Sequence, residues 1–257
     1  MNNTVARMGG KRHLKTYAAP AWWPIPVKER VWTVKPRPGP HPIERAIPLL
    51  ILVRDVLSYA KTAREARKII AEGHIRVDGK VRRDYKFPVG LMDVVEIVDT
   101  GETFRVIPYP IKHYILHPIS KEEASFKLCR IENKTTVKGG HIQLNLHDGR
   151  NVLIRVKDPT NPEEDVYSTL GTVKLAIPKQ ELLDYIPLEK GVIAIVSGGR
   201  NVGRVGRVID IAKGIRRFRS IVTLEDSKGE RFQTSLDYIF VIGKDEPLIS
   251  LPEGAWR

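Results

Sequence analysis

The sequence has little of what several classes of protein require. Its 257 residues include a single cysteine, Cys129, which excludes an intramolecular disulfide framework, a cysteine-rich zinc site and a two-cysteine redox motif. Strictly apolar runs, such as residues 49–53, are far shorter than the roughly 20 residues of a membrane-spanning helix. The basic start also lacks the apolar core of a signal peptide. We therefore expect a protein of a reducing, cytosolic compartment that has no membrane partner.

Acidic residues are outnumbered by basic ones. Lys and Arg total 43 and Asp and Glu total 30, which gives a net charge of +13. A surplus of this size favours an anionic partner, most often nucleic acid, and the alternative is a soluble protein with a charged surface. Residues 1–42 carry eight basic residues and one acidic residue, so more than half of the surplus lies in the first sixth of the chain.

Residues 1–42 form the first of four segments, an extended basic tail. This tail holds seven of the 18 prolines and three of the four tryptophans. Prolines at 36, 38, 40 and 42 favour extended backbone, whereas tryptophans are unusual in a disordered segment. We predict that the tail is ordered on a partner, with cations on phosphates and indoles on bases, and that a chain without it still folds. The alternative, equally open for Trp32, is that the tryptophans pack against the chain's own globular part.

Residues 43–108 predict a helical unit. Apolar residues from Leu49 onward favour a mostly buried helix that ends near Tyr59. A second helix follows, because Thr62 and Glu65 have the spacing of a capping box and Gly73 is placed to end the helix in a left-handed conformation.

A β-hairpin follows this second helix. Residues 74–77 alternate like a strand, and Asp78 with Gly79 predicts a two-residue turn. Residues 93–98 and 104–107 predict further strands. Cations from one helix and one hairpin in a tight unit favour contact with the backbone of a folded RNA. The basic candidates are Arg64, Arg67, Lys68, His74, Arg76, Lys80, Arg82 and Arg83.

Residues 44–108 resemble the alpha-L RNA-binding domain, which is named for ribosomal protein S-four. The domain also occurs in some pseudouridine synthases and some tRNA synthetases. Residues 62–68 and 73–80 carry the resemblance. It implies binding to a structured RNA without specifying which one.

Residues 109–177 predict a small all-β module. The expected strands are residues 126–131, 141–146, 151–156 and 172–177, with a hairpin turn at Asp148 and Gly149. Histidines at 113, 117, 141 and 147 lack the spacing of metal ligands, so we predict no metal site and no cofactor.

Residues 178–257 predict a short helix over residues 179–186 and then a β structure with a glycine-rich loop. The spacing of the loop fits neither a P-loop nor a dinucleotide fingerprint. Residues 188–208 closely resemble the KOW motif, a small Src-homology-3-like β barrel found on RNA, ribosomes and transcription elongation factors. Phe218 is expected either to stack on RNA or to fill the barrel core. The RNA-binding candidates here are Arg200, Asn201, Arg204, Arg207, Arg216 and Arg217.

The order of the four segments resembles the archaeal and eukaryotic type of small-subunit ribosomal protein four along essentially the whole chain. Residues 8–15 and 40–57 add to the resemblance, which makes Met8 a second candidate for the first residue. It implies an α+β, mostly β fold and a non-catalytic component of the small ribosomal subunit. The implied partners are ribosomal RNA and neighbouring ribosomal proteins, with no homo-oligomer, on ribosomes of the cytoplasm. The tail residues expected to contact RNA are Lys11, Arg12, His13, Lys15 and Trp23.

Two rival functions fit parts of the sequence. A pseudouridine synthase can carry an alpha-L domain, but it needs a nucleophilic Asp in an Arg-Leu-Asp setting, and no such tripeptide occurs here. Residues 147–150 are better explained as a hairpin turn. A transcription elongation factor can carry a KOW barrel, but that function leaves the alpha-L resemblance unexplained.

Overall fold

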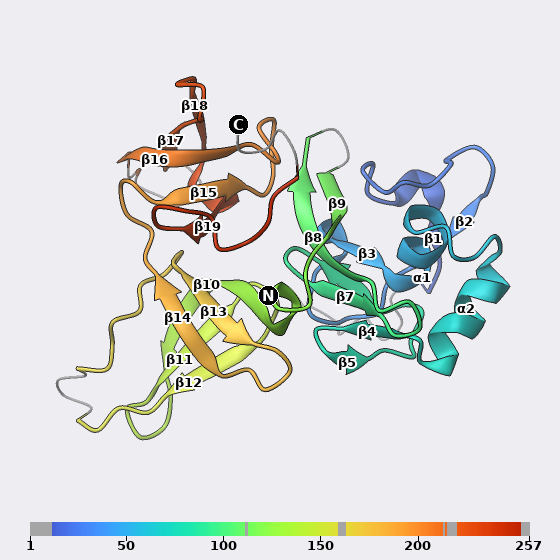
Figure 1. Ribbon diagram of the computed structural model, residues 1–257, viewed down its shortest axis with the longest axis horizontal. Helices are drawn as coiled ribbons and strands as arrows, with labels where there is room; N and C mark the ends of the chain where they lie inside the picture. The colour runs from blue at the N-terminus through green and yellow to red at the C-terminus, as the bar shows by residue number, and fades with distance from the viewer. Residues whose placement is uncertain (1–11, 111–112, 159–162, 213, 215–219, 253–257) are drawn as a thin grey trace, which may run out of the picture.

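The expected α+β, mostly β class is confirmed by three five-stranded antiparallel sheets (Figure 1). The computed structural model describes residues 12–110, 113–158, 163–212, 214 and 220–252. In that part of the chain, no helix combines the length and apolar character needed to cross a bilayer.

The alpha-L unit packs two short helices against a sheet of order β5-β4-β7-β8-β9. Its elements are β3 (Ala46–Pro48), α1 (Leu49–Ile51), the π-helical turn Leu52–Val56, α2 (Ala63–Glu72), β4 (Ile75–Val77), β5 (Lys80–Val81), β6 (Pro88–Gly90), β7 (Val94–Ile97), β8 (Thr103–Tyr109) and β9 (His113–Pro118).

The central sheet has the order β12-β11-β10-β13-β14, and the C-terminal sheet has the order β18-β17-β16-β15-β19. The predicted turn at Asp148 and Gly149 joins β11 to β12. The strands are β10 (Phe126–Thr136), β11 (Ile142–Leu146), β12 (Asn151–Ile154), β13 (Thr172–Ala176), β14 (Leu182–Ile186), β15 (Ile193–Val196), β16 (Val205–Ala212), β17 (Ile221–Glu225), β18 (Arg231–Ser235) and β19 (Ile239–Gly243).

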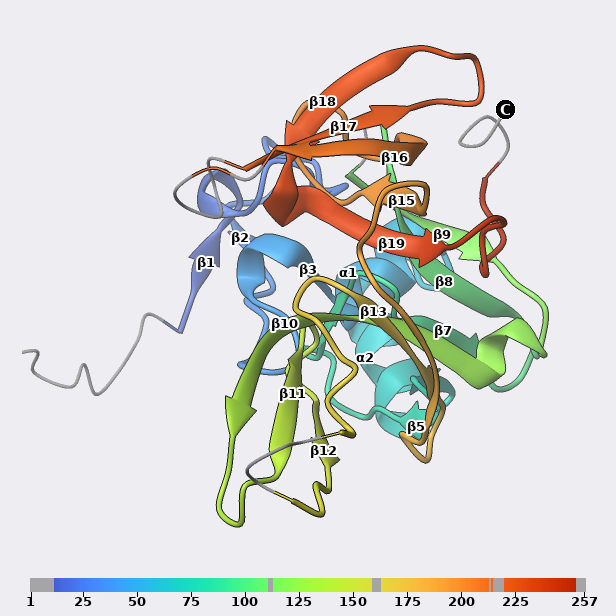
Figure 2. The ribbon, with the colours of Figure 1, turned by 90° about the vertical axis from the view of Figure 1, so that its left-hand side faces the viewer.

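One buried apolar cluster contains residues from all three units. In Figure 2 the C-terminal sheet lies across the top of the other two sheets. Met92 and Ile107 of the alpha-L unit, Leu128 of the central sheet, and Ile195 and Phe240 of the C-terminal sheet belong to the same buried cluster. Strand pairing also crosses two of the expected boundaries. Strand β9 extends the alpha-L sheet beyond residue 108, and β14 extends the central sheet beyond residue 177.

Two sequence predictions about helices were wrong. Residues 179–186 do not form a helix, and β14 pairs with β13 instead. Prolines at 178 and 187 limit the segment to a length too short for a stable helix, and pairing with β13 satisfies its backbone hydrogen-bonding groups. The first helix ends at Val56 rather than near Tyr59, because Ser58 has a φ of 59°, which is incompatible with a right-handed helix.

The described part of the tail, residues 12–42, packs on the alpha-L unit rather than standing free. Strands β1 (Leu14–Lys15) and β2 (Trp32–Thr33) pair with each other. Trp23 is only 4% exposed, and its indole N–H donates to the carbonyl of Ala46 at 2.9 Å. Trp22 is half-buried and donates to the carbonyl of Glu44 at 3.2 Å. Trp22 and Trp23 thus pack against the chain's own globular part, and residues 12–42 of the tail belong to the fold.

Among the described residues, the one-turn 3₁₀ helices are Thr16–Ala18, Ile43–Arg45, Glu123–Ser125 and Leu236–Tyr238.

This packing predicts that Trp23→Ala lowers the free energy of unfolding by about 3–5 kcal/mol, because the substitution leaves a large cavity in the core. Trp32→Ala is the matched control, since Trp32 is 56% exposed and its loss should change stability by less than about 0.5 kcal/mol. Urea unfolding followed by circular dichroism measures both. Equal effects of the two substitutions would show that the tail is not part of the core.

Candidate nucleic-acid interface

Helix α2 is fixed at both ends by the residues that the sequence predicts. Thr62 Oγ1 accepts a hydrogen bond from the backbone N–H of Glu65, and Glu65 Oε2 accepts one from the backbone N–H of Thr62. Hydrogen bonds from the backbone N–H groups of Lys61 and Thr62 to its carboxylate lower the pKa of Glu65. Gly73 ends the helix with a φ of 94°, which favours glycine. The helix therefore holds its cations in a fixed register.

The hairpin after α2 forms as predicted. Asp78 and Gly79 have φ values of 51° and 72°, as a two-residue turn with the twist of the flanking strands requires. The Asp78 carboxylate accepts a hydrogen bond from the backbone N–H of Val94 at 3.0 Å. The turn is thus tied to β7 and cannot change register freely.

Five of the eight cationic candidates on this unit are exposed, although Lys68 lies 3.8 Å from Glu72 and Arg67 lies over the Tyr85 ring. The other three are half-buried and have partners within the fold. His74 lies between Asp99 and Glu72, and its hydrogen bond to Asp99 raises its pKa. Arg76 pairs with Glu96 at 3.4 Å, and the Arg82 guanidinium lies 4.3 Å from the centre of the Phe87 ring. The five exposed cations, which we call the helix–hairpin cations, are Arg64, Arg67, Lys68, Lys80 and Arg83.

The tail brings further cations to the same unit. Arg12, His13 and Lys15 are exposed, and Arg12 and His13 line a groove whose other wall includes Arg67 of α2. Lys11 lies outside the described residues. Trp23, expected to stack on RNA, is instead enclosed by the protein core, so its ring has no free face for a base.

Two exposed arginines lie at this end of the C-terminal sheet, Arg200 in the glycine-rich loop before β16 and Arg207 within β16. The other two described candidates have partners within the C-terminal sheet. The Arg204 guanidinium pairs with Asp226 and Glu230 and lies over a phenylalanine ring, and the Asn201 amide donates to a backbone carbonyl of β18. Arg216, Arg217 and Phe218 lie outside the described residues.

A buried group of charges, here called the ionic cluster, lies where the tail, the alpha-L sheet and the central sheet meet. Lys127 of β10 is 0% exposed, and its Nζ donates to the carboxylates of Asp78, Asp93 and Asp148. The tail reaches the cluster through His41 Nε2, which lies 3.0 Å from Asp93 Oδ1. The members of the cluster are His41, Asp78, Asp93, Lys127, Asp148 and Arg150.

The charges of the ionic cluster balance one another. Burial alone would raise the pKa of Asp148, but the positive charges around it, of which Lys127 is the largest contributor, hold its pKa well below the usual range. Burial would lower the pKa of Lys127, and the three carboxylates raise it well above its ordinary value instead. The pKa of Asp93 is likewise held below its usual range, so Asp93, Asp148 and Lys127 stay ionised inside the protein. No sequence pattern predicts this cluster, and its one local signal is a lysine within the apolar strand that begins at Phe126.

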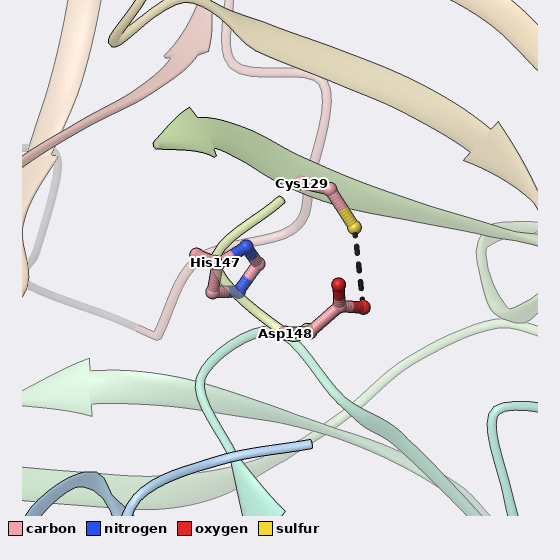
Figure 3. Close-up of side chains that lie close together, drawn as sticks. All are labelled: Cys129, His147 and Asp148. Carbon is pink, nitrogen blue, oxygen red and sulfur yellow. Dashed lines mark hydrogen bonds between the residues drawn. The ribbon is translucent and has the colours of Figure 1, made fainter. Parts of the chain in front are cut away.

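Cys129 and His147 lie together with Asp148 at the edge of the ionic cluster (Figure 3). The Cys129 thiol donates to Asp148 at 3.6 Å, and burial raises its pKa. His147 Nδ1 accepts the backbone N–H of Arg130, and Nε2 donates to the carbonyl of Leu91. Because both ring nitrogens and the carboxylate are hydrogen-bonded and the thiol stays protonated, the three residues are suited to hold the core together rather than to bind a metal.

Comparison with known proteins identifies a family for the whole chain. Family models match in chain order: an RS4NT domain over residues 8–44, an S4 domain over 48–95, ribosomal family S4e over 100–182, and a 40S ribosomal protein S4 C-terminus over 226–255. The small ribosomal subunit protein eS4 of Staphylothermus marinus is 71% identical over 252 residues, which cover 98% of this chain and 100% of that protein. The chain belongs to ribosomal family S4e.

Other members of family S4e match over similar lengths. The eS4 protein of Methanocaldococcus jannaschii is 50% identical and covers 96% of this chain and 100% of its own length. The crystal structure of the 30S ribosomal protein S4e of Thermoplasma acidophilum has a TM-score of 0.64 at 30% identity, over 78% of this chain and 96% of that one. The expected family and the alpha-L domain are thereby confirmed.

The ionic cluster predicts that Lys127→Met lowers the free energy of unfolding by about 3–5 kcal/mol, because the substitution leaves buried carboxylates without their counter-ion. Lys121→Met is the control, since Lys121 is exposed. Denaturant unfolding compares the two variants, and a Lys127→Met protein as stable as the control would contradict the account.

His147 predicts a pH dependence of stability. Burial lowers its pKa to about 3, whereas an unfolded chain protonates histidine near pH 6.5. Below pH 6.5 the unfolded state binds the proton and the folded state does not, so stability is lost as the pH falls; at pH 5 the loss is about 2 kcal/mol. The His147→Asn variant should not show this loss of stability between pH 7 and pH 5. Unfolding midpoints at pH 7 and pH 5 test it, and an identical pH dependence in both proteins would refute it.

Proposed function

We propose that this protein is a structural component of the small ribosomal subunit that binds ribosomal RNA. The observation that carries the proposal is the groove that the tail and α2 line together, because it places the tail cations beside the helix–hairpin cations on one surface. Membership of family S4e supports the small subunit as the location, on ribosomes of the cytoplasm, with neighbouring ribosomal proteins as further partners.

The mechanism we propose is recognition of a folded RNA by its backbone. Exposed cations on short, capped elements keep a fixed spacing, so they can match phosphates of an RNA fold without reading its sequence. Arg200 of the glycine-rich loop and Arg207 of β16 supply a second, separate contact. With about six phosphate contacts, affinity should fall roughly a thousandfold between 50 and 200 mM salt.

The proposal includes no catalytic step. A catalytic base needs an accessible side chain with a free lone pair, and the most perturbed groups among the described residues do not offer one. Asp93 and Asp148 both accept hydrogen bonds from Lys127 in the ionic cluster, and both nitrogens of His147 are hydrogen-bonded. The perturbed pKa values of these four residues are explained by their burial where the tail, the alpha-L sheet and the central sheet pack together.

The proposal predicts a variant with weaker binding to small-subunit RNA and an intact fold. In this variant Ala replaces Arg64, Arg67 and Lys68 together. All three side chains are exposed, and exposed charge changes usually cost little stability. Losing three phosphate contacts should lower the slope of log affinity against log salt by about 2–3. Filter binding across a salt series measures the slope.

The matched control replaces Lys121, Lys138 and Lys157 by Ala, which removes the same charge from exposed positions outside the proposed surface. The control should keep nearly the full slope. If both triple variants lose the same affinity, net charge alone drives binding and α2 is not the contact surface.

A further inference from the structure

The groove between the tail and the alpha-L unit, here called the tail groove, has features that phosphate contact alone does not explain. It has a volume of about 550 Å³, within the range of sites for small ligands. All its charged lining residues among those described are basic. They are Arg12, Arg30 and Lys35 from the tail and Arg54, Arg67 and Lys86 from the alpha-L unit.

The tail groove also exposes an aromatic face. Trp32 is 56% exposed although it lines the groove, whereas Trp22 and Trp23 of the same tail pack into the protein. Two basic residues lie beside its ring: the His13 ring centre is 5.5 Å from the indole centre, and Lys15 Nζ is 5.7 Å from it. An indole left open among cations is suited to stacking on a nucleobase whose phosphates the cations neutralise.

A second aromatic side chain, Tyr85, lines the groove and is half-buried beside two cations. The Arg67 guanidinium lies 4.6 Å from the ring centre and Lys86 Nζ lies 5.5 Å from it. These contacts hold two positive charges at the groove. Arg67 therefore belongs both to the groove and to the helix–hairpin cations.

The walls of the tail groove are held in place by the fold. Lys15 of β1 is the strand partner of Trp32 of β2, and Thr16 Oγ1 donates to the carbonyl of Arg30 at 2.7 Å. Further along, the backbone N–H of Arg37 donates to the carbonyl of Lys86, and the Arg37 guanidinium pairs with Asp84 at 2.9 Å. A groove fixed before its ligand arrives loses little entropy on binding.

We propose that the tail groove binds one unpaired nucleotide of an RNA, with its base stacked on Trp32 and its phosphates beside Arg12, Arg67 and Lys86. A base within a paired helix has no free face for an indole, so the nucleotide must be splayed out of its helix. This proposal rests on the proposed function, because the nucleotide belongs to the small-subunit RNA that the protein binds. It adds a site that reads local RNA structure to a surface that otherwise contacts phosphates.

The test is chemical probing of isolated small-subunit RNA bound to the full-length protein and to three variants. Trp32→Ala should lower affinity about 10- to 100-fold, the contribution of one stacked base, and should expose one unpaired nucleotide that the parent protein protects. Trp32→Tyr keeps an aromatic face and should restore the protection. Tyr17→Ala removes an 80% exposed aromatic residue of the tail that does not line the groove, and should change neither affinity nor protection.

The outcomes separate the two proposals. If the parent protein binds the RNA and Trp32→Ala binds it equally well with the same protections, the nucleotide site is wrong and the proposed function stands. The same conclusion follows if Trp32→Ala binds RNA normally but is lost from assembled subunits, because the groove then receives a segment of a neighbouring protein. If the parent protein does not bind small-subunit RNA, the proposed function itself fails.

Discussion

The buried charge of Lys127 is the constraint on which the arrangement of this protein depends. A lysine without solvent needs its charge balanced, and the three carboxylates around it come from the hairpin turn at Asp78, the loop before β7 at Asp93 and the central turn at Asp148. His41 adds the tail to the same cluster. Moving any of these segments away would leave an uncompensated charge in a low-dielectric interior, which is strongly unfavourable. The cluster therefore specifies one relative position for the tail, the alpha-L unit and the central sheet.

This constraint changes the role of the tail. A free basic arm would lose much entropy on binding RNA, whereas this tail is already paired in β1–β2, packed through Trp23 and fixed at His41. The tail and α2 can then act as one surface, with the tail groove between them. The C-terminal sheet shares the apolar core through residues such as Phe240, so its glycine-rich loop is also held in a defined position.

Local signals made α2 and its hairpin predictable from the sequence. Capping by Thr62 and Glu65, termination at Gly73 and the Asp-Gly turn all depend on neighbours within a few residues. The segment at β14 was not predictable in this way, because its pairing with β13 involves a separate stretch of chain. Trp23 and Trp32 both lie in the basic tail, and only long-range packing, including the hydrogen bond from Trp23 to Ala46, distinguishes the buried indole from the exposed one. The partners of Lys127 lie 49, 34 and 21 residues away, so no local pattern identifies them.

The central claim, that the tail and α2 present one continuous surface to small-subunit RNA, can be measured by directed hydroxyl-radical cleavage. An iron chelate would be attached to a cysteine introduced at Val31, next to Trp32, or at Lys61, just before α2; both positions are exposed, and the native Cys129 is buried. The account predicts that the two probes cut overlapping nucleotides around one RNA junction. Cuts in separate regions of the RNA, or no cuts from the tail probe, would contradict it.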